Sequence, residues 1–215
     1  MSWIITPTQP IPAVIGEPFG GGYFAGYISH TADGNATHAL IVAPRATGAT
    51  GTGYTLTTMQ AWKTAATTTT GTASLFDGAA NTAAMVTAGI ADHPAAQFCV
   101  NLSIGGFTDW YLPSRYELDI AYFNLKPSTT DNNTSLGSNI YSVPQRNSSN
   151  TTTYPAQTTL TAFNTSTEAF VADIHWSSTQ NSASQGWILI FSSGFQGNSS
   201  KTNNRRVRAF RRIAL

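Results

Sequence analysis

The residues whose chemistry suggests a binding function are amides and hydroxyls near the C-terminal end of the chain. Asn, Gln and Ser side chains donate and accept hydrogen bonds without carrying a charge, and an aromatic ring among them adds a flat apolar surface. Sugar hydroxyls and polar protein epitopes are bound by this combination. The candidate ligand-binding residues are Gln180, Asn181, Ser184, Gln185, Trp187, Ser192, Phe195, Gln196, Asn198, Ser199 and Asn203. The alternative is that these are ordinary turn residues, and composition alone favours that interpretation.

A cluster of arginines follows these residues. The cluster consists of Arg205, Arg206, Arg208, Arg211 and Arg212, out of 11 basic residues in the chain. A nucleic-acid site would need stacking aromatics interleaved with the arginines, and Phe210 alone does not supply them. Guanidinium groups on a strand more simply pair with carboxylates, for which Asp109, Glu117 and Asp119 are candidates. The net charge of +1 gives no general attraction to nucleic acid either, so we predict no nucleic-acid partner.

Metal and catalytic sites find little support in the residue types available. Calcium requires clustered oxygen ligands, and Glu168 and Asp173 are the only acids after Asp131. A structural ion at Asp109 or Asp173 stays open. The 4 histidines are scattered, without metal-ligand spacing or an adjacent nucleophile. The single cysteine, Cys99, excludes an intrachain disulfide and a multi-cysteine metal site. We therefore predict a protein that is not an enzyme and that has neither a metal nor a cofactor.

Regular elements must position these residues, and the clearest of them begins in the stretch GGFTDWYLPSRYEL, residues 105–118. Its glycines predict a tight turn, its aromatic residues predict a short strand, and Pro113 ends that strand because proline cannot donate a ladder hydrogen bond. Ser114 and Glu117 have the spacing of a Ser-x-x-Glu capping box. The pattern predicts a helix that begins after Ser114 and ends near Asn124.

Upstream of this stretch the sequence predicts a β-hairpin and a helix. Residues 23–29 and 39–43 have the composition of strands, and residues 33–35 supply turn chemistry between them. Residues 77–90 are rich in alanine and predict a helix with Asp77 as its cap.

Downstream the chain alternates strands with polar loops. Residues 126–166 are a long excursion rich in Thr, Asn and Ser, and loops of this length are usually functional or partly disordered. Three strands are predicted at 175–178, 186–191 and 206–211, with polar loops at 180–185 and 192–204. The two loops and the strand between them carry the candidate ligand-binding residues.

The motifs, taken in order, resemble those of a known family. GGFTDWYLPSRYEL is followed by HWSST at residues 175–179 and by VRAF at residues 207–210. This combination is similar to the pattern of the DUF1566 family, also called the Lcl C-terminal domain. That family is a divergent branch of the C-type lectin fold, found in bacterial surface proteins and in phage tail-associated proteins. Tyr111 stands where the family usually has Arg, and Phe210 stands where Val is commoner.

The resemblance is firmest over residues 98–215, and it implies the fold. We expect an α+β, C-type-lectin-like domain over residues 16–215, with two helices, a small antiparallel sheet and long polar loops. Formylglycine-generating enzymes share that fold, but their copper chemistry needs paired cysteines that this chain lacks. Residues 1–15 carry three prolines among apolar residues. They are expected to form an N-terminal arm for docking or oligomer contact, or else a tail that lies on its own domain.

The function implied by the resemblance is recognition of a host cell. Only 10% of the residues are charged, against about 25% in an ordinary soluble domain, and such surfaces are typical of secreted, fibre-like or particle-bound β proteins. We expect a non-enzymatic receptor-binding module of a phage tail fibre or tail tip, which binds a cell-surface glycan or protein through its C-terminal polar loops. The alternatives are a structural virion adaptor or decoration protein, and a bacterial adhesin that binds glycans.

The expected partners and location follow from the same interpretation. The arm would contact other tail or fibre proteins, and a homotrimer is one candidate assembly. The first residues have neither a basic start nor a long apolar stretch, and no run approaches the ~20 apolar residues that cross a bilayer. We therefore expect synthesis in the host cytoplasm without a signal peptide, no membrane insertion, and a final location in the virion.

Overall fold

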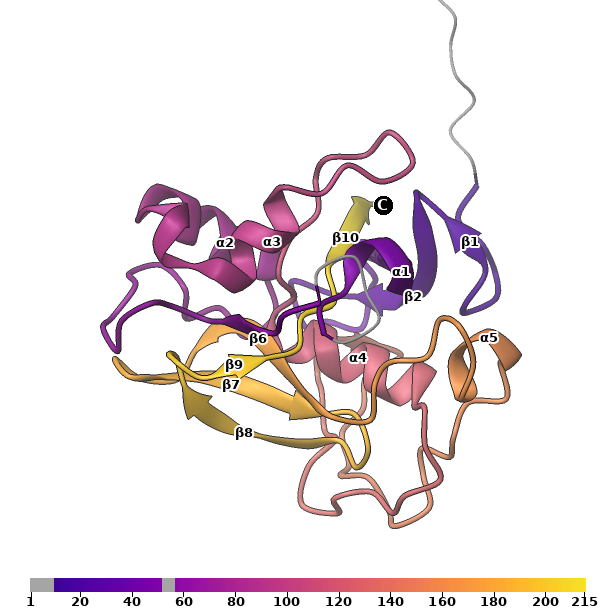
Figure 1. Ribbon diagram of the computed structural model, residues 1–215. Helices are drawn as coiled ribbons and strands as arrows, with labels where there is room; N and C mark the ends of the chain where they lie inside the picture. The colour runs from indigo at the N-terminus through magenta and orange to yellow at the C-terminus, as the bar shows by residue number, and fades with distance from the viewer. Residues whose placement is uncertain (1–9, 52–56) are drawn as a thin grey trace, which may run out of the picture.

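Three antiparallel sheets form the framework of the computed structural model, which describes residues 10–51 and 57–215 (Figure 1). The main sheet has the strand order β1-β2-β3-β10, with β5 paired to β2; a second sheet contains β6-β7-β8 and a third contains β4-β9. The strands are β1 (Pro18–Phe19), β2 (Gly22–Ile28), β3 (His38–Val42), β4 (Gln60–Ala61), β5 (Ser142–Val143), β6 (Ile174–Gln180), β7 (Gln185–Ile190), β8 (Phe195–Ser200), β9 (Asn204–Arg205) and β10 (Phe210–Ala214).

Five α-helices and one 3-10 helix lie in the described part of the chain. They are α1 (Arg45–Gly48), α2 (Gly78–Thr87), η1 (Ile90–Asp92), α3 (Pro94–Val100), α4 (Arg115–Leu125) and α5 (Thr161–Asn164). The α+β class is confirmed, whereas the expectation of two helices and one small sheet is wrong. Helices α1, α3 and α5 span only one or two turns, too short for a periodic apolar pattern to reveal them. None of the described helices has the length and apolar character needed to cross a membrane.

Strand β3 lies inside the main sheet because its sequence is apolar on both faces. Residues 39–42 are fully buried, as expected for a continuous apolar run that is covered on two sides. The strand pairs antiparallel with β2 and with β10, which confirms the predicted hairpin.

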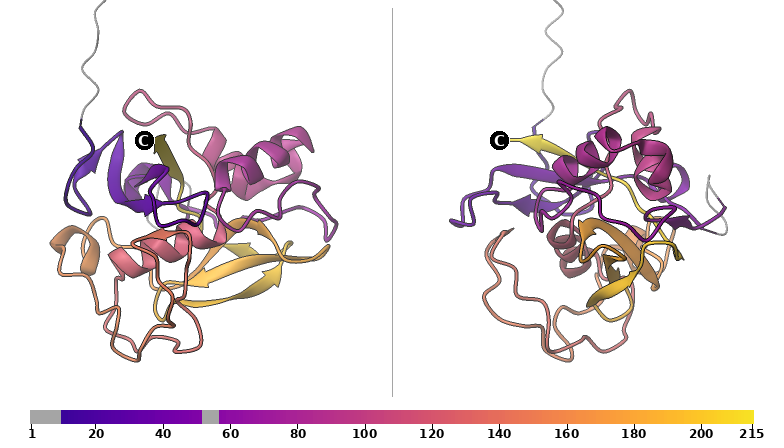
Figure 2. Two further views of the ribbon diagram at one scale, coloured as in Figure 1. Left: turned by 180° about the vertical axis from the view of Figure 1, so that it is seen from behind. Right: turned by 90° about the vertical axis from the view of Figure 1, so that its left-hand side faces the viewer.

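The main sheet separates two apolar cores. Ile41 packs in a cluster with Met85 and Trp110, which includes residues of α2 and α3. Leu40, the neighbouring residue, points to the opposite face and packs with Leu118 in a cluster that includes residues of α4. Figure 2 shows the result: α2 and α3 lie together on one side, and α4 lies between the main sheet and the β6-β7-β8 sheet.

Helix α4 begins at the predicted capping box. Ser114 Oγ accepts a hydrogen bond from the Glu117 amide at 3.4 Å, and Glu117 Oε2 accepts one from the Ser114 amide at 2.7 Å. The helix ends at Leu125, one residue beyond the predicted position. The short strand predicted before it is wrong, because Tyr111 forms only an isolated bridge with Phe210.

The predicted N-terminal arm lies largely outside the described residues, which begin at residue 10. Within the described part, Ile11 and Ile15 are half-buried and pack against the core that contains Trp110. The last residues of the predicted arm therefore contact the domain.

Candidate functional site

Strands β7 and β8 bring part of the predicted set onto one face of the sheet. Trp187 is paired with Asn198, and Leu189 is paired with Gln196, so these four side chains point to the same side. The guanidinium of Arg115, the first residue of α4, lies 3.8 Å from the centre of the Trp187 ring. Arg115 Nε also donates to Gln196 Oε1 at 2.7 Å. Two strands and a helix terminus thus hold the Trp187 ring in one orientation. We call the outward side of this arrangement the β7–β8 face.

The predicted residues differ in exposure. Asn181, Ser184, Phe195, Asn198 and Asn203 are exposed, whereas Gln180, Gln185, Trp187 and Ser192 are half-buried. By strand register, the turn between β6 and β7 and Asn203 lie at one end of the face. Phe195 lies at the other end of β8, and its side chain points to the opposite side of the sheet. The set therefore spreads along the strands and does not surround one pocket.

Two of the predicted ligand-binding residues are corrected by the structure. Gln196 and Ser199 are buried, because the predicted loop 192–204 contains the regular strand β8, which packs inside the protein. The two side chains lie three residues apart and so point to opposite faces of the sheet; α4 covers Gln196. Gln196 Nε2 donates to Asp119 Oδ1 at 2.8 Å inside the protein. Gln180 is also engaged internally, since its Oε1 accepts from the Thr69 amide at 2.8 Å.

Sequence reasoning missed the contribution of Arg115. Its burial lowers the pKa of the guanidinium, and a cavity of about 140 Å³ lies next to it, lined also by Tyr116, Gln196 and residues 135–138. Arg115 belongs to the motif that predicted α4, yet nothing in its local spacing indicates a contact with Trp187. Only the packing of α4 against β7 creates that contact.

A larger cavity of about 510 Å³ lies between α4 and the long excursion. Ile120, Phe123 and Asn124 line it from the helix, and residues 142–151 line it from the excursion. The excursion runs as loops below α4 in Figure 1. It is held in place by stacking of Tyr141 on Phe76, whose ring centres are 4.4 Å apart.

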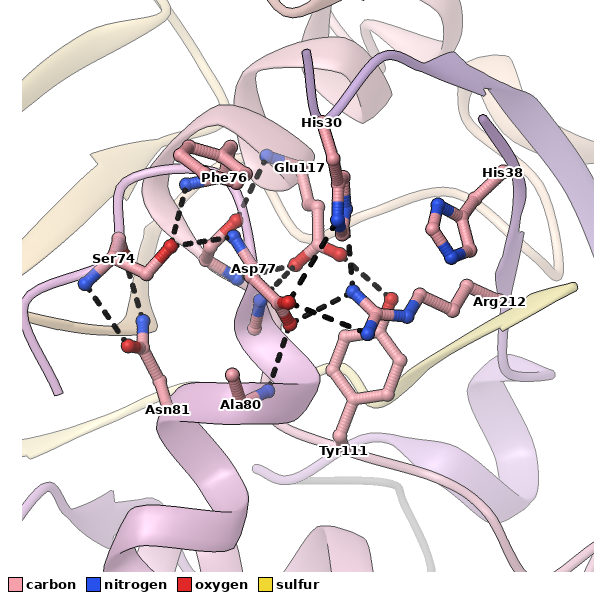
Figure 3. Close-up of polar contacts among 12 residues, drawn as sticks. His30, His38, Ser74, Phe76, Asp77, Ala80, Asn81, Tyr111, Glu117 and Arg212 are labelled. Carbon is pink, nitrogen blue, oxygen red and sulfur yellow. Dashed lines mark hydrogen bonds and ion pairs between the residues drawn. The ribbon is translucent and has the colours of Figure 1, made fainter. Parts of the chain in front are cut away.

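Glu117 lies at the centre of a buried polar cluster (Figure 3). Its Oε1 bonds to the Tyr111 hydroxyl at 2.7 Å, and its Oε2 accepts from the amides of Ser114 at 2.7 Å and Gly78 at 3.1 Å. Burial raises the pKa of the Glu117 carboxyl to about 7. Asp77, as predicted, caps α2 by accepting from the Ala80 amide at 2.8 Å.

The same cluster contains two histidines and Arg212. Among the described residues, this group most resembles a catalytic site. Arg212 Nη1 lies 2.7 Å from Asp77 Oδ1 and 3.2 Å from His30 Nε2. Because a guanidinium only donates, His30 Nε2 accepts and the ring is neutral. Burial and the nearby Arg212 lower the pKa of His30 to about 4. His38 packs against His30 with ring centres 4.3 Å apart. These contacts connect β3, α2 and β10 with the residues that follow β2. The cluster therefore has a structural role.

Four of the five C-terminal arginines pair with carboxylates, as predicted, although the partners differ in part. Arg211 pairs with Asp109, one of the predicted acids. The other pairs are Arg206–Asp173, Arg208–Glu168 and Arg212–Asp77. Glu117 and Asp119 are not their partners; Asp119 pairs with Arg146 of the excursion. Asp109 and Asp173, the two candidate ion ligands, therefore each have an arginine partner. Within the described ranges, no three His, Cys, Asp or Glu side chains gather in a way that could hold a metal ion.

Comparison with known proteins gives a structural similarity of low extent. The chain matches no protein-family profile and no curated protein. Among solved structures, a fimbrial protein from Bacteroides ovatus aligns with 63% of this chain at 20% sequence identity and a TM-score of 0.38. The aligned part spans 24% of that protein's length. A similarity of this size establishes neither a shared fold nor a shared function.

Proposed function

We propose that the chain is a non-enzymatic recognition module with a C-type-lectin-like fold, carried in the virion on a phage tail fibre or tail tip. It binds a host cell-surface glycan or protein through the β7–β8 face. The motif at residues 105–118 and its partners downstream support this fold and setting, since they resemble those of tail-associated members of the DUF1566 family. The N-terminal arm would connect the module to other tail proteins.

The observation that carries the proposal is the pre-ordered geometry of the β7–β8 face. Trp187 is fixed between a strand and the Arg115 guanidinium, 3.8 Å away, and the exposed amide of Asn198 lies beside it on the next strand. An anchored aromatic ring with neighbouring polar side chains loses little conformational entropy on binding. The strands supply the rigidity, and the turn at Asn181–Ser184 supplies adaptable hydrogen-bonding groups.

The polar cluster of Figure 3 supports a protein without catalytic activity. Each of its titratable groups already bonds to a neighbour in the protein: Asp77 to Arg212, Glu117 to Tyr111, and His30 to Arg212. Nucleophilic catalysis requires a base aligned with a nucleophile, and here the imidazole instead accepts from a guanidinium. The proposal therefore assigns recognition to the surface and stability to the cluster.

The test is competition for host attachment. The experiment measures how well purified protein blocks adsorption of the phage whose genome encodes the chain. A triple variant with Asn181, Gln185 and Asn198 replaced by Ala is compared with wild type. We expect the triple variant to lose at least a tenfold factor in blocking potency while its melting temperature is unchanged. Trp187→Ala is measured separately because Trp187 is half-buried.

The matched control replaces the exposed Asn35, in the turn between β2 and β3, and the exposed Thr167, which follows α5, by Ala. This variant should block as well as wild type. If the triple variant also blocks as well as wild type, the β7–β8 face is not the recognition surface. If the wild-type protein does not block at all, a structural adaptor of the particle becomes the better interpretation.

A further inference from the structure

The cavity between α4 and the excursion is chemically distinct from the β7–β8 face. At about 510 Å³ it is in the range of small-molecule sites, and none of its lining residues belongs to β6, β7 or β8. Its walls combine apolar residues of α4, such as Ile120 and Phe123, with amides and hydroxyls of residues 145–151. A concave apolar surface with a few convergent polar groups is the usual form of a binding site for a small ligand.

Two hydrogen-bond donors in the cavity wall have no partner among the residues that the structure describes. The Asn150 side chain belongs to a residue only 7% exposed, and its Nδ2 is unpaired. Arg146 uses Nη2 to bond Asp119, while its Nη1 is buried and unpaired. A buried donor without a partner is destabilising, because it has lost its hydrogen bond to water and gained none in return. Two such donors lining one cavity therefore indicate a ligand that brings acceptor oxygens to them.

The apolar part of the site lies next to these donors. Phe123 lies 4.3 Å from the Arg146 guanidinium, measured to the ring centre, so the ring and the charged group form one wall. Tyr154 contacts the edge of Phe123, with ring centres 5.3 Å apart, and is 59% exposed. An exposed aromatic ring beside unpaired amide donors suits a ligand with one apolar face and a polar edge.

The charge of the cavity narrows the ligand class. No acidic side chain lines it, and the charge of Arg146, the one charged residue in its lining, is balanced by Asp119. A strongly anionic ligand would meet no net positive charge, and a cation would meet no carboxylate. The remaining lining groups are amides and hydroxyls, which bond hydroxyl and carbonyl oxygens.

We propose that this cavity is a second binding site, for a neutral N-acetylated sugar. The acetamido carbonyl oxygen accepts from Asn150 Nδ2 or Arg146 Nη1, the acetamido methyl group contacts Phe123 and Ile120, and the sugar ring lies against Tyr154. The site uses no residue of the β7–β8 face and does not depend on the phage setting. A neutral N-acetylated sugar would thus bind at a position separate from the β7–β8 face.

The experiment is an NMR titration of the isotope-labelled full chain with the methyl glycosides of N-acetylglucosamine, N-acetylgalactosamine, glucose and galactose. We expect at least one N-acetylated sugar to bind with a Kd of about 1 mM, typical of a small ligand held by few contacts. That sugar should shift the side-chain amide signals of Asn150, and its counterpart without the acetamido group should bind at least tenfold more weakly.

Two variants and one control make the assignment specific. Asn150→Ala removes an amide nitrogen that bonds nothing in the protein, and Tyr154→Ala removes an exposed ring; each should weaken sugar binding at least tenfold. Tyr154→Ala decides the question if Asn150→Ala fails to fold. Asn198→Ala, an exposed amide on the β7–β8 face, should leave sugar binding unchanged.

The inference is overturned if none of the four sugars shifts the Asn150 signals, or if binding survives both cavity variants. A protein that binds the sugar through the cavity but fails to block phage adsorption would retain this site and lose the proposed function. A protein that blocks adsorption without binding any of the sugars would retain the proposed function and lose the second site.

Discussion

The carboxyl group of Glu117 joins the N-termini of two helices. It accepts from the amide of Ser114, the cap of α4, and from the amide of Gly78, the first residue of α2. The contact between Glu117 and Ser114 belongs to the local capping box and was predicted from the sequence. The contact between Glu117 and Gly78 depends on how α2 packs against α4, so no local sequence pattern could predict it.

The raised pKa of Glu117 predicts a specific pH dependence of stability. In the unfolded chain the carboxyl has its usual pKa of 4.5, whereas burial holds the folded-state pKa at about 7. The folded state therefore keeps a proton that the unfolded state has lost. The stability due to this group is fully present below about pH 4.5 and is lost as the pH rises through about 7.

Glu117→Gln tests this directly, because glutamine keeps a carbonyl oxygen for the two amides but cannot ionise. Relative to wild type, the variant should gain about 3 kcal/mol in free energy of unfolding between pH 4 and pH 8, from a pKa difference of about 2.5 units. Urea unfolding at several pH values measures it. The control Glu17→Gln, at an exposed carboxyl, should show no such gain. A difference between Glu117→Gln and wild type that stays constant with pH would contradict the assignment.

At the scale of elements, the predictions that succeeded were local and those that failed depended on distant pairing. The α4 cap and the β2–β3 hairpin are encoded within short segments, and both formed. Strand β8, with the sequence FQGNSS, has little intrinsic strand preference and is ordered by pairing along its whole length with β7. This pairing fixes Gln196 beneath Arg115 and Asp119 of α4 and turns Ser199 to the opposite face of the sheet.

The junction between α2 and α4 requires a residue without a side chain. A Cβ added at Gly78 would lie 2.5 Å from the Ser114 amide nitrogen and 2.8 Å from the Leu112 carbonyl oxygen, and closer still to the Glu117 carboxylate. All three neighbours are fixed, two of them by the backbone. We therefore expect Gly78→Ala to destabilise the fold by about 1–3 kcal/mol, as overpacking does.

Helix propensity alone predicts the opposite sign, since alanine is favoured over glycine in a helix by about 1 kcal/mol. Ala83→Gly, at an exposed position of the same helix, is the matched control and should cost about that amount. Thermal unfolding of both variants separates the two effects. A stabilised Gly78→Ala protein would show that α2 and α4 do not approach as closely as described.

At the scale of the whole molecule, buried side chains organise the long excursion. Asn132 Nδ2 donates to the carbonyl oxygens of Thr151 and Pro155, each at 3.0 Å. Lys126 is buried and donates to the Pro155 carbonyl at 3.3 Å, and burial lowers its pKa. Asn139 Nδ2 donates to Asp119 at 2.8 Å. The composition of the excursion predicted a functional or partly disordered loop, but not these contacts, because each joins residues far apart in the sequence.

This hydrogen-bond network is relevant to the prediction that the protein needs no metal ion to fold or to bind. An ion that ordered the loops would need several free carboxylates at one place. In the described part of the chain, Asp119, Asp173 and Glu168 each pair with an arginine. The hydrogen bonds of Asn132 and Asn139 meanwhile supply the cross-links that a bound ion would otherwise provide.

We therefore expect EDTA to leave the melting temperature, host-cell attachment and sugar binding unchanged, because no step of folding or recognition would require a bound cation. Asn132→Ala, in contrast, should lower the melting temperature, since it removes the two hydrogen bonds by which one buried side chain ties residue 132 to residues 151 and 155. Differential scanning calorimetry with and without EDTA, run alongside a calcium-dependent lectin as a positive control for chelation, measures both effects. A melting temperature that falls in EDTA and recovers on addition of calcium would show that carboxylates now paired with arginines serve as ion ligands, and that the amide network alone does not order the excursion.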